Sequence, residues 1–210
     1  WSKVTLHEPV PNPVMEEPIR RILGLRVKDM REIVSGKEVN GIRGTSGMKE
    51  VLGKLDIDAE LAKQKINAQR LRGADRDNAV KVIGYLSAAK KQGIHPADWM
   101  ISKVPILPPK FRPIAIMGDM PLIADINSLY SDLIEQNNNI KDLKKELPDS
   151  EMGDERLQLY DAVTTAYGLG ESINPEGQSK RLKGALRQVI GANPKYGMAQ
   201  SKLFSKTVSG

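Results

Sequence analysis

The strongest pattern of hydrophobic and polar positions lies between residues 126 and 147. Apolar side chains recur there at alternating steps of three and four, which is the spacing of a coiled-coil seam. Gln136 is the one polar member of this seam, and its apolar members are Ile126, Leu129, Leu133, Ile140, Leu143 and Leu147. The spacing predicts one helix over the whole stretch.

A second apolar stripe follows after a proline. Pro148 lacks a backbone N–H and disfavours helical geometry in the residue before it, so the first helix is expected to end here. Two helices joined by a short turn predict an antiparallel arm of about 33 Å, from roughly 22 residues per limb and about 1.5 Å of rise per residue. The same periodicity also fits two helices of an ordinary bundle. The members of the second stripe are Met152, Leu159, Val163 and Ala166.

Helical spacing also recurs before this arm, at residues 16–25, 46–55, 58–71 and 76–91. In the third of these stretches Leu61, Ile66 and Leu71 share one face, and Asp58 can cap its start. Residues 1–14 predict an extended edge segment, because apolar positions alternate and a proline-rich run (PVPNP) follows. The glycine-containing stretch 35–47 predicts a loop or a weak hairpin. The expected fold class is therefore mainly α with short β strands.

Residues 101–113 (ISKVPILPPKFRP) contain four prolines. Prolines and the residues before them avoid helical geometry, so the backbone is expected to be extended. Lys103, Lys110 and Arg112 add positive charge, and Phe111 adds an aromatic ring. Two interpretations fit this composition. One is a polyproline ligand for an SH3-like groove, and the other is a stiff loop placed against nucleic acid.

Composition limits the kinds of site that the chain can carry. The absence of cysteine excludes disulfides and thiolate metal sites and argues for a reducing compartment. His7 has no second histidine or cysteine nearby, so it is not expected to bind a metal. His95 precedes Pro96 in a turn and is expected to satisfy a backbone group, not to act in catalysis. Charged residues make up 28% of the chain, and its longest apolar run is far shorter than a membrane span. We therefore expect a soluble protein without a membrane partner.

Charge is distributed unevenly along the chain. Residues 119–161 contain eleven acidic and four basic residues, a net charge of −7. Residues 177–210 contain seven basic residues and no acidic one. A tail of one sign with glycines and a few aromatic rings is typical of a segment that binds a polyanion such as nucleic acid. A solvated basic face without a partner is the alternative interpretation.

The order of several motifs resembles that of a known protein family. The motifs are WMISKVPILPPKFRP at 99–113, NSLY at 127–130, NNN at 137–139, SKRLK at 179–183 and GANPKYG at 191–197. In this order they closely resemble the largest (beta-prime) subunit of multi-subunit DNA-dependent RNA polymerases. Weaker similarity at 4–13 and 48–56 extends the resemblance over nearly the whole chain. The divergence is similar to that of bacteriophage-encoded polymerases.

The resemblance implies an organisation into four parts. Residues 1–100 are similar to the helical base of the polymerase clamp, and residues 101–124 to the lid loop, which separates RNA from template DNA. Residues 125–170 look like the clamp coiled coil, an antiparallel hairpin. Residues 171–210 resemble the extended rudder and the switch segment that touches the template strand.

The resemblance also implies functional residues. Those expected near the phosphates of template DNA or the RNA–DNA hybrid are Lys110, Arg112, Lys180, Arg181, Lys183, Arg187, Lys195, Gln200, Lys202 and Lys206. Those expected to dock a promoter-specificity (sigma-like) factor are Asp132, Glu135, Gln136, Asn137 and Asn139. Gln136 stands where bacterial arms carry an arginine, and the arm is acidic, so docking of an ordinary sigma factor is in doubt.

The family's catalytic motif, NADFDGD, is absent from the sequence. Its aspartates hold the Mg²⁺ ions of nucleotidyl transfer, so no catalytic residue, metal ligand or cofactor is expected in this chain, and Mg²⁺ is expected in the assembled polymerase. The implied partners are a beta-like chain, the remainder of beta-prime, DNA and RNA, in the cytoplasm of a bacterial host. The alternative function is a non-enzymatic adaptor with an acidic coiled coil, a polyproline ligand and a basic nucleic-acid-binding tail.

Overall fold

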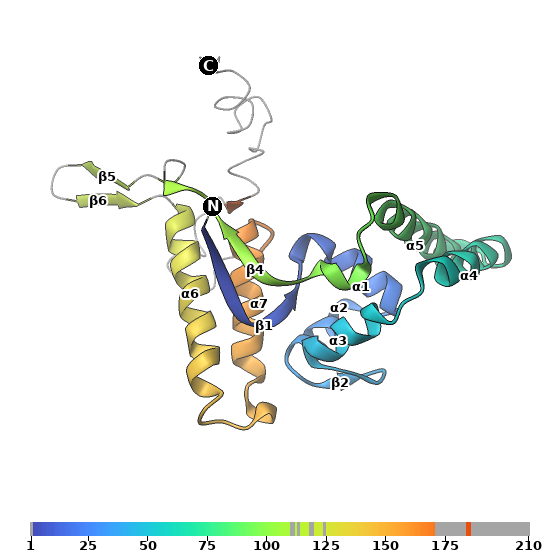
Figure 1. Cartoon of the computed structure of the whole chain (residues 1–210), viewed down its shortest axis with the longest axis horizontal. Coiled ribbons are helices and arrows are strands. Elements are labelled where there is room, and N and C mark those ends of the chain that lie inside the picture. Colours follow the sequence, from blue (N-terminus) through green and yellow to red (C-terminus); the bar gives the residue numbers. More distant parts are fainter. Residues whose placement is uncertain are drawn as a thin grey trace, which may run out of the picture. The chain divides into compact units, whose positions relative to one another are not determined.

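The computed structural model describes residues 2–109, 112, 114–117, 120–123, 125–170, 184 and 185 (Figure 1). The described elements are mainly helices, and the strands occur in pairs, so the predicted fold class is confirmed. The chain divides into two compact units. Unit 1 comprises residues 1–7, 103–146 and 158–210, and unit 2 comprises residues 8–102 and 147–157.

Unit 2 contains most of the described helices. After β1 (Ser2–Pro11) and a short 3-10 turn, η1 (Pro13–Met15), come α1 (Glu16–Leu23) and α2 (Val27–Val34). A two-residue hairpin, β2 (Glu38–Val39) with β3 (Ile42–Arg43), leads into α3 (Gly44–Gly53). The predicted weak hairpin is thus present, whereas α2 was not predicted from the sequence. It buries Met30, Ile33 and Val34 on one side of a helix of only eight residues.

Two longer helices, α4 (Ile57–Arg70) and α5 (Gly73–Gln92), lie side by side in unit 2 (Figure 1). Asp56, and not Asp58 as predicted, caps α4, since its carboxylate accepts hydrogen bonds from the backbone N–H groups of Asp58 and Ala59. Gly93 ends α5 with a left-handed backbone (φ 65°), which glycine adopts without strain. Helix α5 thus ends one residue beyond the predicted helical stretch 76–91.

The core of unit 2 explains how these helices are held. One buried cluster joins α1, α2, α3, the end of α5 and the turn η2 (Pro96–Trp99), and includes Ile19, Ile33, Met48, Leu52 and Trp99. A second joins Leu61 of α4 to Val82 and Leu86 of α5. The predicted apolar face of residues 58–71 is wrong beyond Leu61, because Ile66 is 53% and Leu71 39% exposed.

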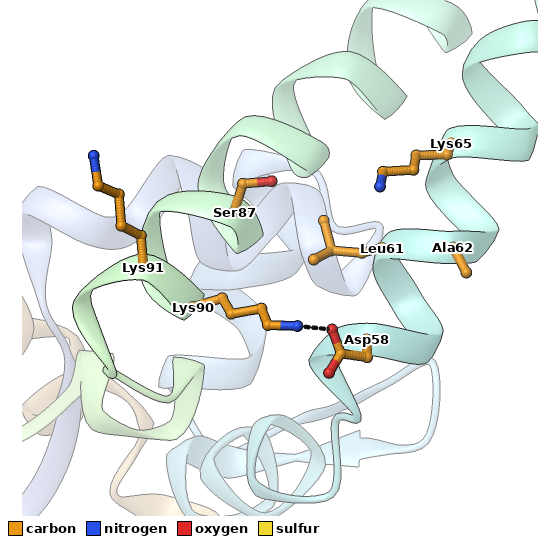
Figure 2. Close-up of a pocket in the computed structure, with 7 residues that line it drawn as sticks. All are labelled: Asp58, Leu61, Ala62, Lys65, Ser87, Lys90 and Lys91. Carbon is orange, nitrogen blue, oxygen red and sulfur yellow. Dashed lines mark hydrogen bonds and ion pairs between the residues drawn. The ribbon is translucent and has the colours of Figure 1, made fainter.

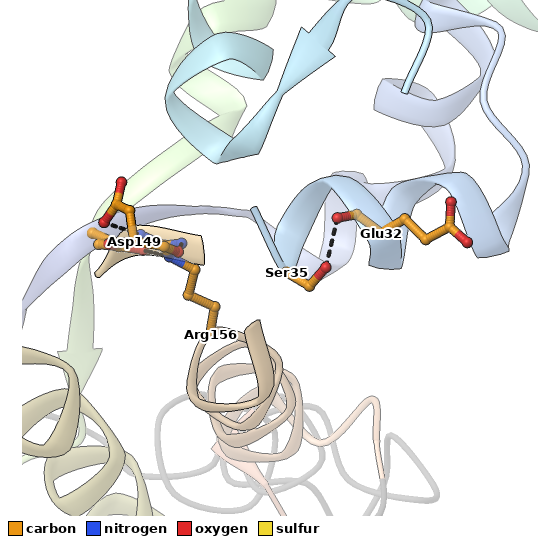
Figure 3. Close-up of polar contacts among 5 residues, drawn as sticks. Glu32, Ser35, Asp149 and Arg156 are labelled. Carbon is orange, nitrogen blue, oxygen red and sulfur yellow. Dashed lines mark hydrogen bonds and ion pairs between the residues drawn. The ribbon is translucent and has the colours of Figure 1, made fainter. Parts of the chain in front are cut away.

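An arginine whose side chain is only 11% exposed holds the turn that precedes the last long helix within unit 2. Arg156 of α7 (Gly153–Tyr167) donates Nε and Nη2 to the two carboxylate oxygens of Glu8, at 2.9 and 3.0 Å. It also binds the side chain and the carbonyl of Asp149, both at 2.8 Å, in η4 (Asp149–Glu151). Figure 3 shows this contact near Ser35, whose hydroxyl donates to the carbonyl of Glu32. The side chains of Arg156 and Glu8 are only 11% and 12% exposed, whereas that of Asp149 is 80% exposed. Loss of either Arg156 or Glu8 would therefore leave a charge that is largely removed from solvent without this partner.

In unit 1 the extended strand β4 (Met100–Ile106) continues from residue 103, and β4 pairs with β1. An antiparallel hairpin follows, β5 (Ile114–Met117) with β6 (Met120–Ile123), in which Met117 lies opposite Met120. It was not predicted, because the whole stretch 101–124 was interpreted as a loop. Then come α6 (Asp125–Leu143) and the part of α7 beyond residue 157.

Helices α6 and α7 correspond to the predicted arm (Figure 1). Their stripes are largely buried, with Ile126, Leu133 and Ile140 on α6 and Leu159 and Val163 on α7 each at most 1% exposed. The buried polar position of α6 is Asn137, however, and Gln136 is only partly buried. That the two helices form a coiled coil stays a prediction, as does the division into four parts.

Candidate nucleic-acid interface

The candidate interface begins where β4 ends and the proline-rich loop starts. Tyr130 of α6 is 4% exposed, and its hydroxyl accepts a hydrogen bond from the N–H of Leu107 at 3.2 Å. The same hydroxyl donates to the carbonyl of Pro105 at 3.4 Å. Burial raises the pKa of Tyr130 above its ordinary value, so the hydroxyl keeps the proton that it donates. One side chain therefore satisfies two backbone groups at the start of the loop.

A second contact fixes the far side of the loop. Nη1 of Arg112 donates to Oδ1 of Asn127 at 2.8 Å, and Nδ2 of Asn127 donates to the carbonyl of Arg112 at 3.1 Å. Nε of Arg112 donates to the carbonyl of Leu107 at 2.8 Å. The guanidinium also lies 6.0 Å from the centre of the Tyr130 ring, within cation–π range.

Arg112 was predicted to lie near phosphate, but in the structure its guanidinium binds protein groups. It is half-buried, and two of its nitrogens bind protein groups, so its position is fixed before any phosphate arrives. Contact with a phosphate stays a prediction for Arg112. The other candidates lie outside the described residues, namely Lys110, Lys180, Arg181, Lys183, Arg187, Lys195, Gln200, Lys202 and Lys206. The structure thus brings Arg112 together with two residues, Asn127 and Tyr130, that were not predicted as site residues.

A third polar contact of α6 holds β1. Asn137 is 4% exposed; its Oδ1 accepts from the N–H of His7 at 2.9 Å, and its Nδ2 donates to the carbonyl of Thr5 at 3.0 Å. The side-chain amide thus accepts from one backbone group of β1 and donates to another, as the backbone of a paired strand does. Inside this structure the side chain of Asn137 has a structural role, since both of its polar atoms are already bonded.

The remaining predicted docking residues lie closer to solvent on α6. Glu135 and Asn139 are exposed, and Asp132 and Gln136 are partly buried. Burial, and then the charge of Glu135, raise the pKa of Asp132 above its ordinary value. Asn139 donates to Gln136 at 3.4 Å. Docking of a promoter factor at these residues stays a prediction.

The described residues offer neither a metal site nor a membrane-spanning helix. In that part of the chain, no three histidine, aspartate or glutamate side chains gather closely enough to hold a metal ion. Nor does any helix within it have the length and apolar character needed to cross a bilayer.

Comparisons with known proteins identify the family. No family model matches the chain. The beta' subunit of DNA-directed RNA polymerase from Chromobacterium violaceum is 31% identical over 181 residues, which are 82% of this chain and 12% of that subunit. The corresponding subunit of Lacticaseibacillus casei is 28% identical over 176 residues, and that of Dechloromonas aromatica is 29% identical over 208 residues, 95% of this chain. The chain spans about 14% of the length of these two relatives.

The hydrogen bonds described above join the segments that resemble this subunit. The loop at 105–112 is bound by Asn127 and Tyr130 of the NSLY motif, and β1 is bound by Asn137 of the NNN motif. The similarity thus covers residues that contact one another in the fold. Over most of its length, this chain is related to a segment of the beta' subunit of DNA-directed RNA polymerase.

Proposed function

We propose that the chain is a part of the beta' subunit of a multi-subunit DNA-directed RNA polymerase, and that it holds template DNA and the RNA–DNA hybrid during transcription. The observation that carries this proposal is the proline-rich loop held by Asn127 and Tyr130. Both the loop and the side chains that shape it lie in motifs that resemble the polymerase subunit. A loop fixed in advance loses little conformational entropy when it contacts nucleic acid.

The contacts are proposed to be with phosphate groups. The basic residues of 177–210, together with Lys110, supply positive charge without acidic neighbours in the tail. Phosphate contacts position nucleic acid and carry no direct sequence information. Arg112 contributes through the shape of the loop, because its guanidinium is bonded to Leu107 and Asn127.

Catalysis is assigned to another segment or another chain. Mg²⁺ bound there would stabilise the attacking and leaving oxygens of nucleotidyl transfer. The partners in this proposal are a beta-like chain, the rest of beta' and, on the exposed face of α6, a sigma-like factor. The proposed location is the cytoplasm of a bacterial cell, and a bacteriophage origin stays a prediction.

Salt dependence tests the proposed phosphate contacts. Binding of the assembled enzyme to template DNA would be measured between low and moderate salt for the triple variant Lys180→Ala, Arg181→Ala, Lys183→Ala. The slope of log K against log salt is negative, and each lost phosphate contact reduces its magnitude by about 0.7 to 0.9. For the triple variant the magnitude is therefore expected to fall by about 2 to 3.

The control for this experiment changes the charge by the same amount elsewhere. Lys3, Lys37 and Lys49 are exposed and lie far from the basic tail in sequence. Their triple alanine variant should keep the original slope. Equal slopes for all three enzymes would contradict nucleic-acid contact by Lys180, Arg181 and Lys183.

A further inference from the structure

Helices α4 and α5 enclose an open groove that neither the polymerase resemblance nor the proposed function uses. The groove has a volume of about 510 Å³ and is lined by Asp58, Leu61, Ala62, Lys65, Ser87, Lys90 and Lys91 (Figure 2). Leu61 is buried and forms an apolar floor, whereas the other six lining residues are exposed. Ligand pockets usually bury most of their ligand. A small molecule in this open groove would remain largely in solvent, so the groove suits a larger partner better.

The charge of this groove is positive. Residues 57–92 contain eight basic and four acidic residues. Lys90 is paired with Asp58 across the groove, but Lys65 and Lys91 form no ion pair or hydrogen bond within the described part of the chain. Figure 2 shows the side chain of Lys65 extending from α4 toward α5. Unpaired cations beside an apolar floor favour a partner that carries negative charge.

One exposed apolar side chain lies on the same face of α5, nearer its amino-terminal end. Val80 precedes Ser87 by seven residues and Arg76 precedes Val80 by four, so all three share one face of the helix with Lys91. Val80 is 48% exposed. A phosphate group could use the cation Lys91 but not the valine, whereas a partner helix with both carboxylate and apolar side chains could contact the two.

We propose that the groove between α4 and α5 binds an acidic amphipathic helix of a partner protein. Apolar side chains of that helix would cover Leu61, Ala62 and Val80, and its carboxylates would pair with Lys65 and Lys91. This is the helix-in-groove mode of recognition, in which contacts recur at steps of three and four residues. The proposal rests on the groove alone and does not depend on the polymerase assignment.

Carbodiimide crosslinking of the affinity-purified assembly tests the proposal, because this reagent joins an amine directly to a carboxylate that it contacts. Lys65 and Lys91 are expected to be joined to carboxylates of a single other polypeptide, at positions three, four or seven residues apart. Crosslinks to scattered carboxylates, or none from these two lysines, would overturn the proposal. So would crosslinks that appear only after nuclease treatment, since nucleic acid would then be the occupant.

A pair of neighbouring substitutions supplies the control. Ser87 lines the groove, whereas Ala88 is also exposed on α5 but does not line it. Ser87→Trp would fill the groove and is expected to lower the amount of crosslinked polypeptide at least tenfold, while Ala88→Trp leaves it within twofold. Circular dichroism would establish that both variants remain helical. Equal losses in the two variants, or no loss in either, would contradict the assignment of the groove.

Discussion

Arg112 and Asn127 bind each other in both directions. The guanidinium of Arg112 donates to the side-chain oxygen of Asn127, and the side-chain nitrogen of Asn127 donates to the carbonyl of Arg112. An amide is suited to this exchange because it carries a donor and an acceptor side by side. The pair connects the end of the proline-rich loop to the first turn of α6.

Asn127→Ala should therefore destabilise unit 1. The substitution removes both hydrogen bonds and leaves partly buried polar groups unpaired, with an expected loss of about 1 to 3 kcal/mol in the free energy of unfolding. The exposed neighbour Ser128 provides the control, since Ser128→Ala should change this free energy by less than about 0.5 kcal/mol. Urea denaturation would measure both. Similar values for the two variants would mean that the exchange with Arg112 adds nothing to stability.

The second prediction concerns the stability of alanine variants in the asparagine motif at 137–139. Asn137→Ala should cost about 2 kcal/mol of unfolding free energy, because the groups of Thr5 and His7 lose their partner. Asn139→Ala should cost less than about 0.5 kcal/mol, because Asn139 is exposed. Denaturation of both variants would show which of them loses more unfolding free energy. An Asn139 variant that is the less stable of the two would contradict the buried position of Asn137.

The third prediction concerns the stability of an alanine variant of Gly36, which lies close to Arg156. Both Gly36 and Gly41 have left-handed backbones, with φ of 95° and 77°. A methyl group on Gly36 would meet Nη1 of Arg156 at 2.7 Å, whereas one on Gly41 would meet open space. Both alanine variants are destabilised by the backbone strain, but Gly36→Ala also displaces an arginine bonded to Glu8 and Asp149.

The expected difference between these two variants is at least about 1 kcal/mol, which is the net worth of one or two hydrogen bonds that Arg156 would lose. Thermal denaturation of the two proteins under the same conditions measures it. Equal melting temperatures would show that Arg156 moves aside without loss.

The fourth prediction concerns Asp29 and the pH dependence of folding stability. It sits in the first turn of α2 and accepts hydrogen bonds from the side chain and the backbone N–H of Arg26, which together lower its pKa from 3.8 to about 2. Because the pKa is lower in the folded protein than in the unfolded chain, the stabilisation is complete above about pH 4. It is lost as the pH falls from there toward 2.

Melting temperatures measured between pH 2 and pH 5 would check this dependence. The protein should lose stability over this range more steeply than the Asp29→Asn variant, which has no carboxylate to protonate. Glu38→Gln, on an exposed strand residue, should leave the steepness unchanged. Identical curves for the protein and the Asp29→Asn variant would exclude Asp29 as the group responsible.

The helices of the arm were predictable because their apolar residues recur with a regular period. The pattern could not decide between Gln136 and Asn137, since both are polar and lie next to each other in sequence. The choice depends on β1, whose Thr5 and His7 provide backbone partners for a short amide. Such a contact joins residues 130 or more positions apart, and no local pattern contains it.

Other features were missed for different reasons. Helix α2 was missed although Val27, Met30 and Val34 recur at steps of three and four, and it buries Met30 and Ile33 in the core of unit 2. The hairpin of β5 and β6 was missed because prolines precede it and Pro121 lies within β6, although Gly118-Asp119 between its strands is a sequence typical of hairpin turns. Asn127 and Tyr130 were visible as part of a motif, but their partners were not.

The proposed function places this chain inside an RNA polymerase. Affinity purification of the chain from its source under native conditions, followed by mass spectrometry and a nucleotide-incorporation assay on the eluate, tests it most directly. The account predicts that a chain bearing the NADFDGD motif co-purifies and that the eluate synthesises RNA in a Mg²⁺-dependent reaction. A folded chain that elutes alone, or with partners that lack this motif and this activity, would contradict it.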